Sequence, residues 1–454
     1  MKRRVAVTGL GVVSSIGNSV ADFWRSCLAG TSRVEPIPPA WLAYSQFASR
    51  LWSPLAEPDY EAHGIGRIER LQNDRTALIA MVAAFQALEE AGIAREMRDE
   101  KRNTFALPGV EPERAGISLG TGIGGVSSLL GNFLHHALTR PKTTLREVRD
   151  HLGTTEAETR ELLADCEQRL QAPARDNPFA VAMAMPNTAA SALSVKLSLV
   201  GPHRTHCAAC ASGTVALGHG YRSIASGETD LVLAGGVELL DDPYGSIFHS
   251  FDLARTLVRG DDPERSNRPF DRERSGFLFS QGGGAVLVLE ELERARGRGV
   301  PILAEIAGFA ETSDAHNLMV MEAGGRQIAR AIDNALADAG LKPEEIDYVN
   351  AHGTGTLAND EAEAAVLART FGTRPLINST KSLLGHTIGA SGALEAVVTV
   401  LSLQHQTTHA CRNLEDPIAD LNFVRRVNSY PMRSALSQSF AFGGHNAALV
   451  FRAG

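Results

Sequence analysis

Two cysteines with C-x-x-C spacing lie in the stretch "HCAACASGTVALGHGYRSIASG", residues 206–227. Cys210 comes directly before apolar residues at helical spacing, which predicts that it lies at the N-terminus of a helix. The unpaired N–H groups and the dipole at that end favour a thiolate over a thiol and can bind an oxyanion. We expect Cys207 in the incoming strand, where burial would make it inert. The stretch alone fits a nucleophilic Cys210, a redox pair or two packed cysteines.

The cysteine set argues against a disulfide framework and against zinc. The chain has five cysteines, and an odd, sparse set in a long chain without a signal peptide does not describe a disulfide framework. A structural zinc site needs a second close pair, and the spaced histidines His405 and His409 lie far downstream. A thioredoxin-like pair is expected in a much smaller domain. A redox or regulatory thiol protein that uses Cys207 and Cys210 stays as an alternative from a different class.

Two later stretches carry basic side chains that could assist a cysteine. In "VNAHGTGTLANDEAE", His352 follows a short predicted strand in a glycine-threonine turn, where we expect it to be more exposed than a core histidine. Glu363 lies near the start of the next predicted helix. In "NSTKSLLGHTIGASGALEAV", Lys381 and His386 are close together in an apolar setting, with Glu395 further on. This spacing favours a positively charged pocket, although each residue could also be a loop, surface or packing residue.

The stretch "SFAFGGHNAALVF" near the C-terminus predicts a glycine turn between two strands. It contains two aromatic residues, Phe440 and Phe442, followed by the pair Gly443 and Gly444. By itself this stretch indicates only the turn.

The elements that would position these residues are repeated along the chain. The helical run "RTALIAMVAAFQALEEAGI", followed by "VEPERAGISLGTGIGG", resembles "RQIARAIDNALADAGL", followed by "KPEEIDYVNAHGTGT". The first helical run ends at Gly92 and the second at Gly340, and each glycine suits a left-handed C-cap. The stretch "CASGTVALGHGYRSIASG" likewise corresponds to "GASGALEAVVTVLSLQHQ". We therefore predict a duplicated α/β unit, with halves 1–298 and 299–454 and a site that draws on both.

Two further segments shape the prediction. Near the N-terminus, "VAVTGLG" predicts a buried strand that ends in a glycine turn, and "TGLGVVSSIG" lacks the third glycine of a dinucleotide-binding motif. Residues 126–177 are polar, charged and helical in period. The runs "TTLREVRDHLG" and "TEAETRELLADCEQRL" each have a threonine near the start and predict two solvent-facing helices.

The composition is that of an ordinary globular protein. Of 454 residues, 44% are hydrophobic and 21% are charged, and the formal net charge is -8. This balance gives no reason to expect binding to nucleic acid or anionic lipid. No apolar run is long enough for a membrane span, and the N-terminus lacks the pattern of a signal peptide. We expect a cytoplasmic protein without membrane insertion.

Together the motifs resemble those of an elongating beta-ketoacyl-acyl carrier protein synthase, a condensing enzyme of the thiolase superfamily. The resemblance runs from "RVAVTGLGVVSSIGNSVADFWRSCLAG" to "SFAFGGHNAALVF" and includes "LVLAGGVE" and "NRPFDRERSGFLFSQGGGAVLVLEE". The order of Cys210, His352 in H-G-T-G-T, and Lys381 and His386 in T-K-S-x-x-G-H is highly specific. The resemblance implies an α/β, thiolase-like duplicated αβαβα layered fold with two pseudo-equivalent halves, and a homodimer.

The resemblance also implies a mechanism. Cys210 would take an acyl group from the phosphopantetheine thioester of an acyl carrier protein, and the backbone N–H groups of Cys210 and Phe442 would bind the oxyanion. Phe442 would gate the acyl pocket. No metal or nucleotide cofactor is implied. The C-x-x-C spacing would then be coincidental.

The second substrate in this mechanism is malonyl carrier protein. His352 and His386 would act as neutral imidazoles that stabilise the enolate left by decarboxylation. The enolate would attack the acyl group on Cys210 and give a 3-oxoacyl product. Lys381, paired with Glu363, would orient the site.

Several positions depart from the family pattern, and one alternative pathway fits the same motifs. Ala441 stands where glycine is usual in the gate turn, His445 where threonine is frequent, and Ser275 and Gln281 where acidic residues are common. The segment 126–177 is longer than expected, and we hypothesise that it reshapes the pocket or the carrier-protein surface. A condensing enzyme of a polyketide or aryl-polyene pathway is the alternative within the enzyme class.

An acidic carrier protein also requires a local basic patch. The candidate arginines form two groups in the sequence, Arg67, Arg70 and Arg75, or Arg255, Arg259, Arg265 and Arg268.

Overall fold

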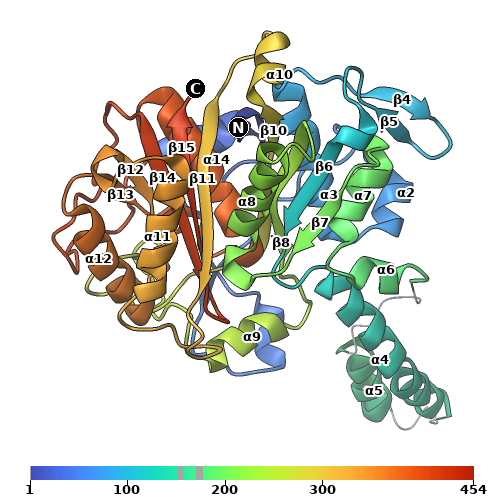
Figure 1. Cartoon of the computed structure of the whole chain (residues 1–454). Coiled ribbons are helices and arrows are strands. Elements are labelled where there is room, and N and C mark those ends of the chain that lie inside the picture. The colour runs from blue at the N-terminus through green and yellow to red at the C-terminus, as the bar shows by residue number, and fades with distance from the viewer. Residues whose placement is uncertain (1, 152–156, 170–176) are drawn as a thin grey trace.

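A ten-stranded sheet forms the centre of the computed structural model, which describes residues 2–151, 157–169 and 177–454 (Figure 1). The strand order is β13-β12-β14-β15-β11-β1-β10-β8-β6-β7. The first half of the chain supplies β1 (Val5–Val13), β6 (Ala115–Gly120), β7 (His203–His206), β8 (Leu231–Leu239) and β10 (Gly282–Glu291). The second half supplies β11 (Ala304–Ser313), β12 (Tyr348–Asn350), β13 (Leu376–Asn378), β14 (Ser434–Ala441) and β15 (His445–Ala453).

The two halves repeat one topology. Outward from the centre, β1-β10-β8-β6-β7 matches β11-β15-β14-β12-β13. In each series the first two pairings are antiparallel and the last two are parallel. The halves join where β1 pairs antiparallel with β11. In its pairing with β10, β1 has a bulge after Val7, and in its pairing with β15, β11 has a bulge after Ile306. The predicted duplicated fold is confirmed, and the boundary at residue 298 stays a prediction.

Helices form three layers around the two half-sheets. The central layer contains α8 (Ser212–Ala225) and α14 (Ser391–His405), which pack on each other and on strands of both halves. The outer layers contain α3 (Arg75–Glu90) and α7 (Thr188–Leu197) on one side, and α11 (Arg326–Ala339) and α12 (Leu357–Phe371) on the other. Figure 1 shows α8 between the two half-sheets.

The burial pattern of β10 explains this layering. Leu287 and Leu289 pack into the central core, whereas Val286 and Val288 pack into the outer core with α3. Alternate side chains of a strand point to opposite faces of the sheet. A strand with apolar residues on both faces therefore needs helices on both sides.

The glycines of β1 are part of the strand and do not form the predicted turn. A Cβ at Gly9 would lie 2.1 Å from the carbonyl oxygen of Ala87, and one at Gly11 would lie 1.8 Å from that of Ala83, both on α3. The glycines let the backbone of α3 lie directly on the strand. The prediction of a turn here was wrong because close packing and chain reversal both select glycine.

The segment 126–177 forms α4 (Val126–His151) and α5 (Ala157–Arg169), which pack together and extend away from the body of the protein (Figure 1). The first helix begins at Val126, so Thr143 lies inside it and does not cap it, contrary to the prediction. Residues 152–156 and 170–176 of this segment lie outside the described residues.

The remaining elements complete the surface. Two small sheets consist of β2 (Glu35–Pro36), β3 (Leu51–Ser53) and β9 (Phe279–Ser280), and of β4 (Glu96–Asp99) and β5 (Thr104–Ala106). The other α-helices are α1 (Val20–Leu28), α2 (Arg67–Gln72), α6 (Ala180–Ala184), α9 (Ser246–Leu253), α10 (Leu292–Gly297) and α13 (Lys381–Leu384). None of the described helices is long and apolar enough to cross a membrane.

Candidate active site

Cys210 lies at the start of the central helix α8. The chain leaves β7, passes through a short 3-10 turn, η4 (Ala209–Ala211), and enters α8 at Ser212. Ala209 has a φ of 45°, in the left-handed region, which sets the sharp turn before the helix. The Cys210 thiol lines a cavity of about 320 Å³. The backbone N–H groups of Phe442 and of Cys210 itself lower the pKa of this thiol. The N–H groups of two turns of the chain thus act on the sulfur.

Burial outweighs the helix N-terminus in setting the charge of this thiol. Cys210 is 6% exposed, and desolvation raises the pKa of its thiol to about 12, against the opposing effects of Lys381 and the two N–H groups. The helix N-terminus favours a thiolate, as the sequence indicates, but burial acts in the opposite direction and favours the thiol.

Cys207 is exposed, contrary to the expected burial. It follows the last residue of β7, which is the outermost strand of the sheet. An edge strand has no neighbour to cover its end, and the sequence did not show that this strand lies at the edge. All five cysteines are free thiols.

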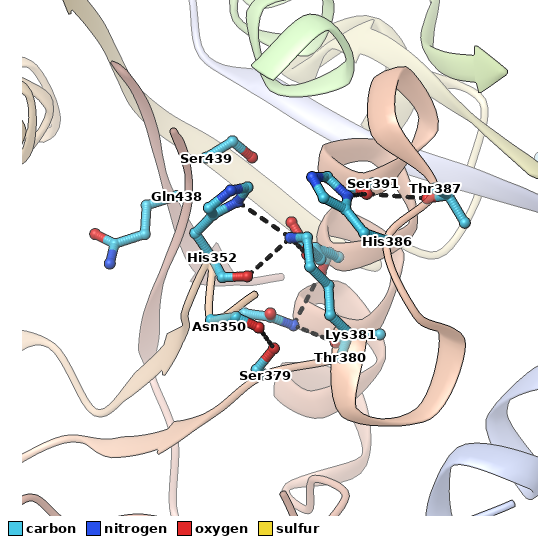
Figure 2. Close-up of polar contacts among 12 residues, drawn as sticks. Asn350, His352, Ser379, Thr380, Lys381, His386, Thr387, Ser391, Gln438 and Ser439 are labelled. Carbon is cyan, nitrogen blue, oxygen red and sulfur yellow. Dashed lines mark hydrogen bonds and ion pairs between the residues drawn. The ribbon is translucent and has the colours of Figure 1, made fainter. Parts of the chain in front are cut away.

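Two adjacent parallel strands bring His352 and Lys381 together. His352 follows β12, and Lys381 opens α13 just after β13. The Lys381 ammonium donates to the His352 backbone carbonyl at 2.9 Å and faces its Nδ1 at 3.1 Å (Figure 2). A third hydrogen bond and ion pair goes to Glu395 on α14. All three protons of the ammonium are therefore used inside the protein.

The partner of Lys381 is Glu395, and the predicted pairing with Glu363 was wrong. The Glu363 carboxylate, on α12, instead accepts the backbone N–H groups of His352 and of the residue after it, both at 2.7 Å. It therefore fixes the turn that carries His352. Burial raises the pKa of each carboxyl group to about 7. The sequence offered two carboxylates in this region, and only the packing of α12 and α14 decides which one reaches the lysine.

The hydrogen bonds assign one tautomer to both histidines. His386 Nδ1 accepts the Ile388 backbone N–H at 3.2 Å and lies 3.0 Å from the Ser391 hydroxyl (Figure 2). His352 Nδ1 faces the ammonium of Lys381, which can only donate. Each ring thus carries its proton on Nε2.

Both imidazoles are neutral and close together. Burial, followed by the charge of Lys381, holds the pKa values of His352 and His386 well below the usual range. The ring centroids lie 5.5 Å apart at a steep angle. His352 is 3% exposed, so the prediction of an exposed loop histidine was wrong because helices close over the turn. The site offers two neutral N–H donors beside a cysteine in one cavity.

The C-terminal glycine turn forms another wall of the cavity. Phe442, Gly443 and Gly444 connect β14 with β15 and line the cavity, and the two glycines have φ values of 84° and 79°. Phe440 is buried, with its ring 5.5 Å from that of His352. Ala441 is half-buried and packs against the cluster that contains Cys210.

Sequence reasoning missed one stretch of the wall, residues 317–321. This stretch gives no signal, because its apolar side chains have neither the spacing of a helix nor that of a strand. Among the described residues, no group of three or more histidine, cysteine or acidic side chains is arranged to hold a metal ion.

Two family models together match most of the chain. The chain matches the N-terminal domain of beta-ketoacyl synthases over residues 2–295 and their C-terminal domain over residues 303–415. It belongs to the beta-ketoacyl synthase family. The resemblance predicted from the motifs is therefore confirmed, and the chain is a condensing enzyme of the acyltransferase type.

The relatives of this synthase include 3-oxoacyl-[acyl-carrier-protein] synthases and polyketide synthases. The "3-oxoacyl-[acyl-carrier-protein] synthase 2" of Coxiella burnetii is 35% identical, over 99% of this chain and 98% of the relative. A "putative polyketide beta-ketoacyl synthase 1" of Streptomyces halstedii is 37% identical, over 99% of this chain and 98% of the relative. A solved type II polyketide ketosynthase, in complex with its acyl-carrier protein and bound to a hexaketide, has a TM-score of 0.79 and 26% identity, with each chain fully covered.

The arginines predicted as a carrier-binding patch are mostly paired within the synthase. Five of them form ion pairs with acidic side chains: Arg70 with Glu61, Arg75 with Glu57, Arg259 with Asp252, Arg265 with Glu415, and Arg268 with Asp271. Arg255 is exposed and lines the cavity, and Arg67 is exposed at the start of α2. These last two remain candidates for an acidic partner.

The other departures from the family pattern have local partners. The Ser275 hydroxyl accepts the backbone N–H of Arg259 at 2.9 Å, and the Gln281 amide oxygen accepts that of Leu55 at 2.9 Å. His445 is exposed at the start of β15.

Proposed function

We propose that this chain is an elongating 3-oxoacyl-acyl carrier protein synthase of fatty acid biosynthesis. It would join malonyl carrier protein to an acyl group held on Cys210, with loss of carbon dioxide. The observation that carries the proposal is the arrangement of His352 and His386 as neutral Nε2–H donors in the cavity that Cys210 lines. Family membership supports the same reaction class.

The first step is acyl transfer. Cys210 Sγ attacks the thioester carbonyl of the acyl carrier, and the carbon–sulfur bond to phosphopantetheine breaks. The thiol proton of Cys210 ends on the departing pantetheine sulfur, so the exchange is balanced. The N–H groups of Cys210 and Phe442, which lower the pKa of the thiol, would stabilise the oxyanion of the intermediate.

The second step is decarboxylation and condensation. The malonyl carboxylate leaves as carbon dioxide, and its electron pair passes to the thioester enolate. The Nε2–H groups of His352 and His386 donate to the enolate oxygen. The enolate carbon then attacks the acyl group, the thiolate of Cys210 departs, and it regains a proton. Lys381 keeps Nδ1 of His352 in its role as acceptor.

The partners follow from the same proposal. The acyl carrier protein would dock near Arg255, which lines the cavity, or near Arg67 on α2. We propose a homodimer, because β7 lies at the end of the sheet and its outer edge has no strand partner among the described residues. The enzyme would act in the cytoplasm without a metal or nucleotide cofactor.

Intact-protein mass spectrometry tests the proposal. The wild type is incubated with acyl carrier proteins that bear acyl chains of different length. We expect one acyl adduct in the wild type and in Cys207→Ala, and none in Cys210→Ala. Loss of the adduct in Cys207→Ala alone would favour the redox or regulatory thiol protein, and no adduct with any chain would refute the elongating role.

A polyketide or aryl-polyene condensing enzyme is the second candidate function. The 37% identity to the Streptomyces halstedii polyketide synthase favours it. The same acyl panel, followed by malonyl carrier protein, separates the two. A 3-oxoacyl product extended by one malonyl unit, with a single keto group, supports fatty acid synthesis, and products extended repeatedly that retain several keto groups support the polyketide function.

A further inference from the structure

The side chain of Glu238, near the end of β8, joins the two halves of the protein. It is fully buried. Its Oε1 accepts three donors of the loop 121–124, which follows β6, at 3.1 to 3.4 Å. Its Oε2 accepts the backbone N–H of Gly122 in that loop and, at 3.2 Å, that of Gly389. Gly389 belongs to a short 3-10 turn, η6 (Ile388–Ala390), which leads into α14. One carboxylate therefore bridges a loop of the first half and a turn of the second.

Two glycines leave room for this bridge. A Cβ at Gly122 would lie 2.6 Å from Oε2 of Glu238, and one at Gly389 would lie 2.5 Å from the same oxygen. Both distances are far inside van der Waals contact, so any other residue would push the carboxylate away. Burial raises the pKa of this carboxyl group, whereas its N–H donors lower it and favour the carboxylate.

On the second-half side, the bridge holds a strained turn that contacts His386. Ile388, directly before Gly389, has a φ of 49°. This left-handed conformation is unfavourable for a β-branched residue and persists only where the surroundings hold it. In this conformation the Ile388 N–H donates to Nδ1 of His386 at 3.2 Å. Glu238 thus fixes the residue next to the one that assigns the tautomer of His386.

On the first-half side, the turn that carries Cys210 has hydrogen bonds of its own. The Ser212 hydroxyl accepts the Ala208 N–H at 2.9 Å and lies 3.1 Å from the carbonyl oxygen of Thr121. Neither contact involves the carboxylate of Glu238. Loss of the bridge should therefore disturb the histidine turn more than the cysteine turn.

We propose that Glu238 is a positioning residue for decarboxylation: it holds the turn 388–389 in the conformation in which His386 presents its Nε2–H to the enolate. This inference rests on the proposed function, in which that N–H stabilises the enolate. Glu238 itself touches neither substrate nor the reacting atoms. It acts through Gly389 and Ile388, so it should matter for the malonyl step and little for acylation of Cys210.

Two variants separate the reach of this side chain from its charge. Glu238→Gln has one acceptor oxygen, so whichever way the amide turns, its NH₂ group faces N–H donors and one side of the bridge is lost. Glu238→Asp keeps the negative charge but is one methylene shorter and cannot span both sides. The matched control is Glu290→Gln on β10, which removes another fully buried carboxylate. The partners of that carboxylate, Thr8, Arg294 and Arg298, do not line the cavity.

The readouts are the rate of carbon dioxide release from malonyl carrier protein and the rate of Cys210 acylation by an acyl carrier. We expect both Glu238 variants to slow the release about tenfold or more, since a hydrogen bond to a charged group is lost. Acylation should stay close to the wild-type rate, whereas a general loosening of the fold would slow both steps. The control should match the wild type in both rates.

Combination with His386→Ala tests whether Glu238 acts through the histidine. In that background Glu238→Gln should cause no further loss of carbon dioxide release, because the group that it positions is gone. Nitrogen-15 NMR of histidine-labelled protein gives a readout that does not depend on activity. The wild type should show His386 with its proton on Nε2 alone, and both Glu238 variants should show a mixture of tautomers.

The outcomes separate this inference from the proposed function. If the wild type releases carbon dioxide and both Glu238 variants match it, the positioning role is refuted and the condensing function stands. Equal slowing of both steps would refute it too, since that is the mark of a general structural role. A further loss in the double variant would show that Glu238 does not act through His386. A wild-type rate in Glu238→Asp alone would mean that charge matters and the bridge does not. If the wild type is neither acylated nor able to release carbon dioxide, the proposed function fails, and the inference fails with it.

Discussion

The protonation state of Cys210 gives the sharpest test of how burial and helix position compete. With a thiol pKa of about 12, the thiolate fraction at pH 7.5 is about 3 in 100,000, whereas an ordinary cysteine has about one-tenth of its thiol ionised. Alkylation of Cys210 should therefore be about three orders of magnitude slower than that of an exposed thiol. The rate should rise about tenfold per pH unit through pH 9 without a plateau.

The assay is alkylation by iodoacetamide in a Cys207→Ala background that removes the exposed neighbour. Peptide mass spectrometry then separates the Cys210 adduct from that of the half-buried Cys166. Lys381→Met should slow the reaction further, because Lys381 is the largest opposing influence that lowers the pKa of this thiol. The control is free cysteine under the same conditions. A plateau of the Cys210 rate below pH 9 would refute the reasoning, since it would mean that the helix N-terminus holds a thiolate against burial.

Three further changes have defined outcomes. His386→Ala should slow release of carbon dioxide from malonyl carrier protein by about 10²–10³-fold yet leave acylation of Cys210 intact; equal loss of both steps would contradict a role in decarboxylation. Burial holds the pKa of His409 at about 4, below its unfolded value, so unfolded chains bind a proton first as the pH falls. Stability should be complete above about pH 6.5 and decline by up to about 3 kcal/mol towards pH 4, as urea unfolding would measure, with a shallower decline in His409→Gln. Gly9→Ala should destabilise the protein by more than about 2 kcal/mol, because its Cβ would meet the carbonyl of Ala87; an unchanged Tm would show that α3 can move away.

The sequence predicted what short patterns encode. The Cys210, His352, Lys381 and His386 motifs lie at ends of strands or starts of helices, where a glycine turn marks the position. The two-fold repeat predicted the two half-sheets, because the same helix and turn signals recur in the same order. Such features depend on residues close together in the chain.

Most of the wrong predictions concern contacts between distant elements. The Lys381 partner depends on how α14 packs beside α13, and the exposure of Cys207 depends on β7 being the last strand. The charge of the Cys210 thiol depends on how deeply the side chain is buried, and no local sequence pattern predicts that burial. Gly9 was assigned to a turn because glycine is selected both by a turn and by close packing against a helix, here α3, and the sequence alone does not separate the two.

The duplication explains why one half supplies the nucleophile and the other supplies the basic groups. The starts of α8 and α14 correspond, with Cys210 opposite Gly389 and Ser212 opposite Ser391. A Cβ at Gly389 would lie 2.4 Å from the backbone nitrogen of Gly122, so the second half has no room for a side chain where the first carries its thiol. Its serine instead contacts the imidazole of His386 at 3.0 Å. The two copies of one helix start thus carry different tasks. Cys210 at the first start lines the cavity itself, and the serine at the second start contacts His386, which lines the same cavity.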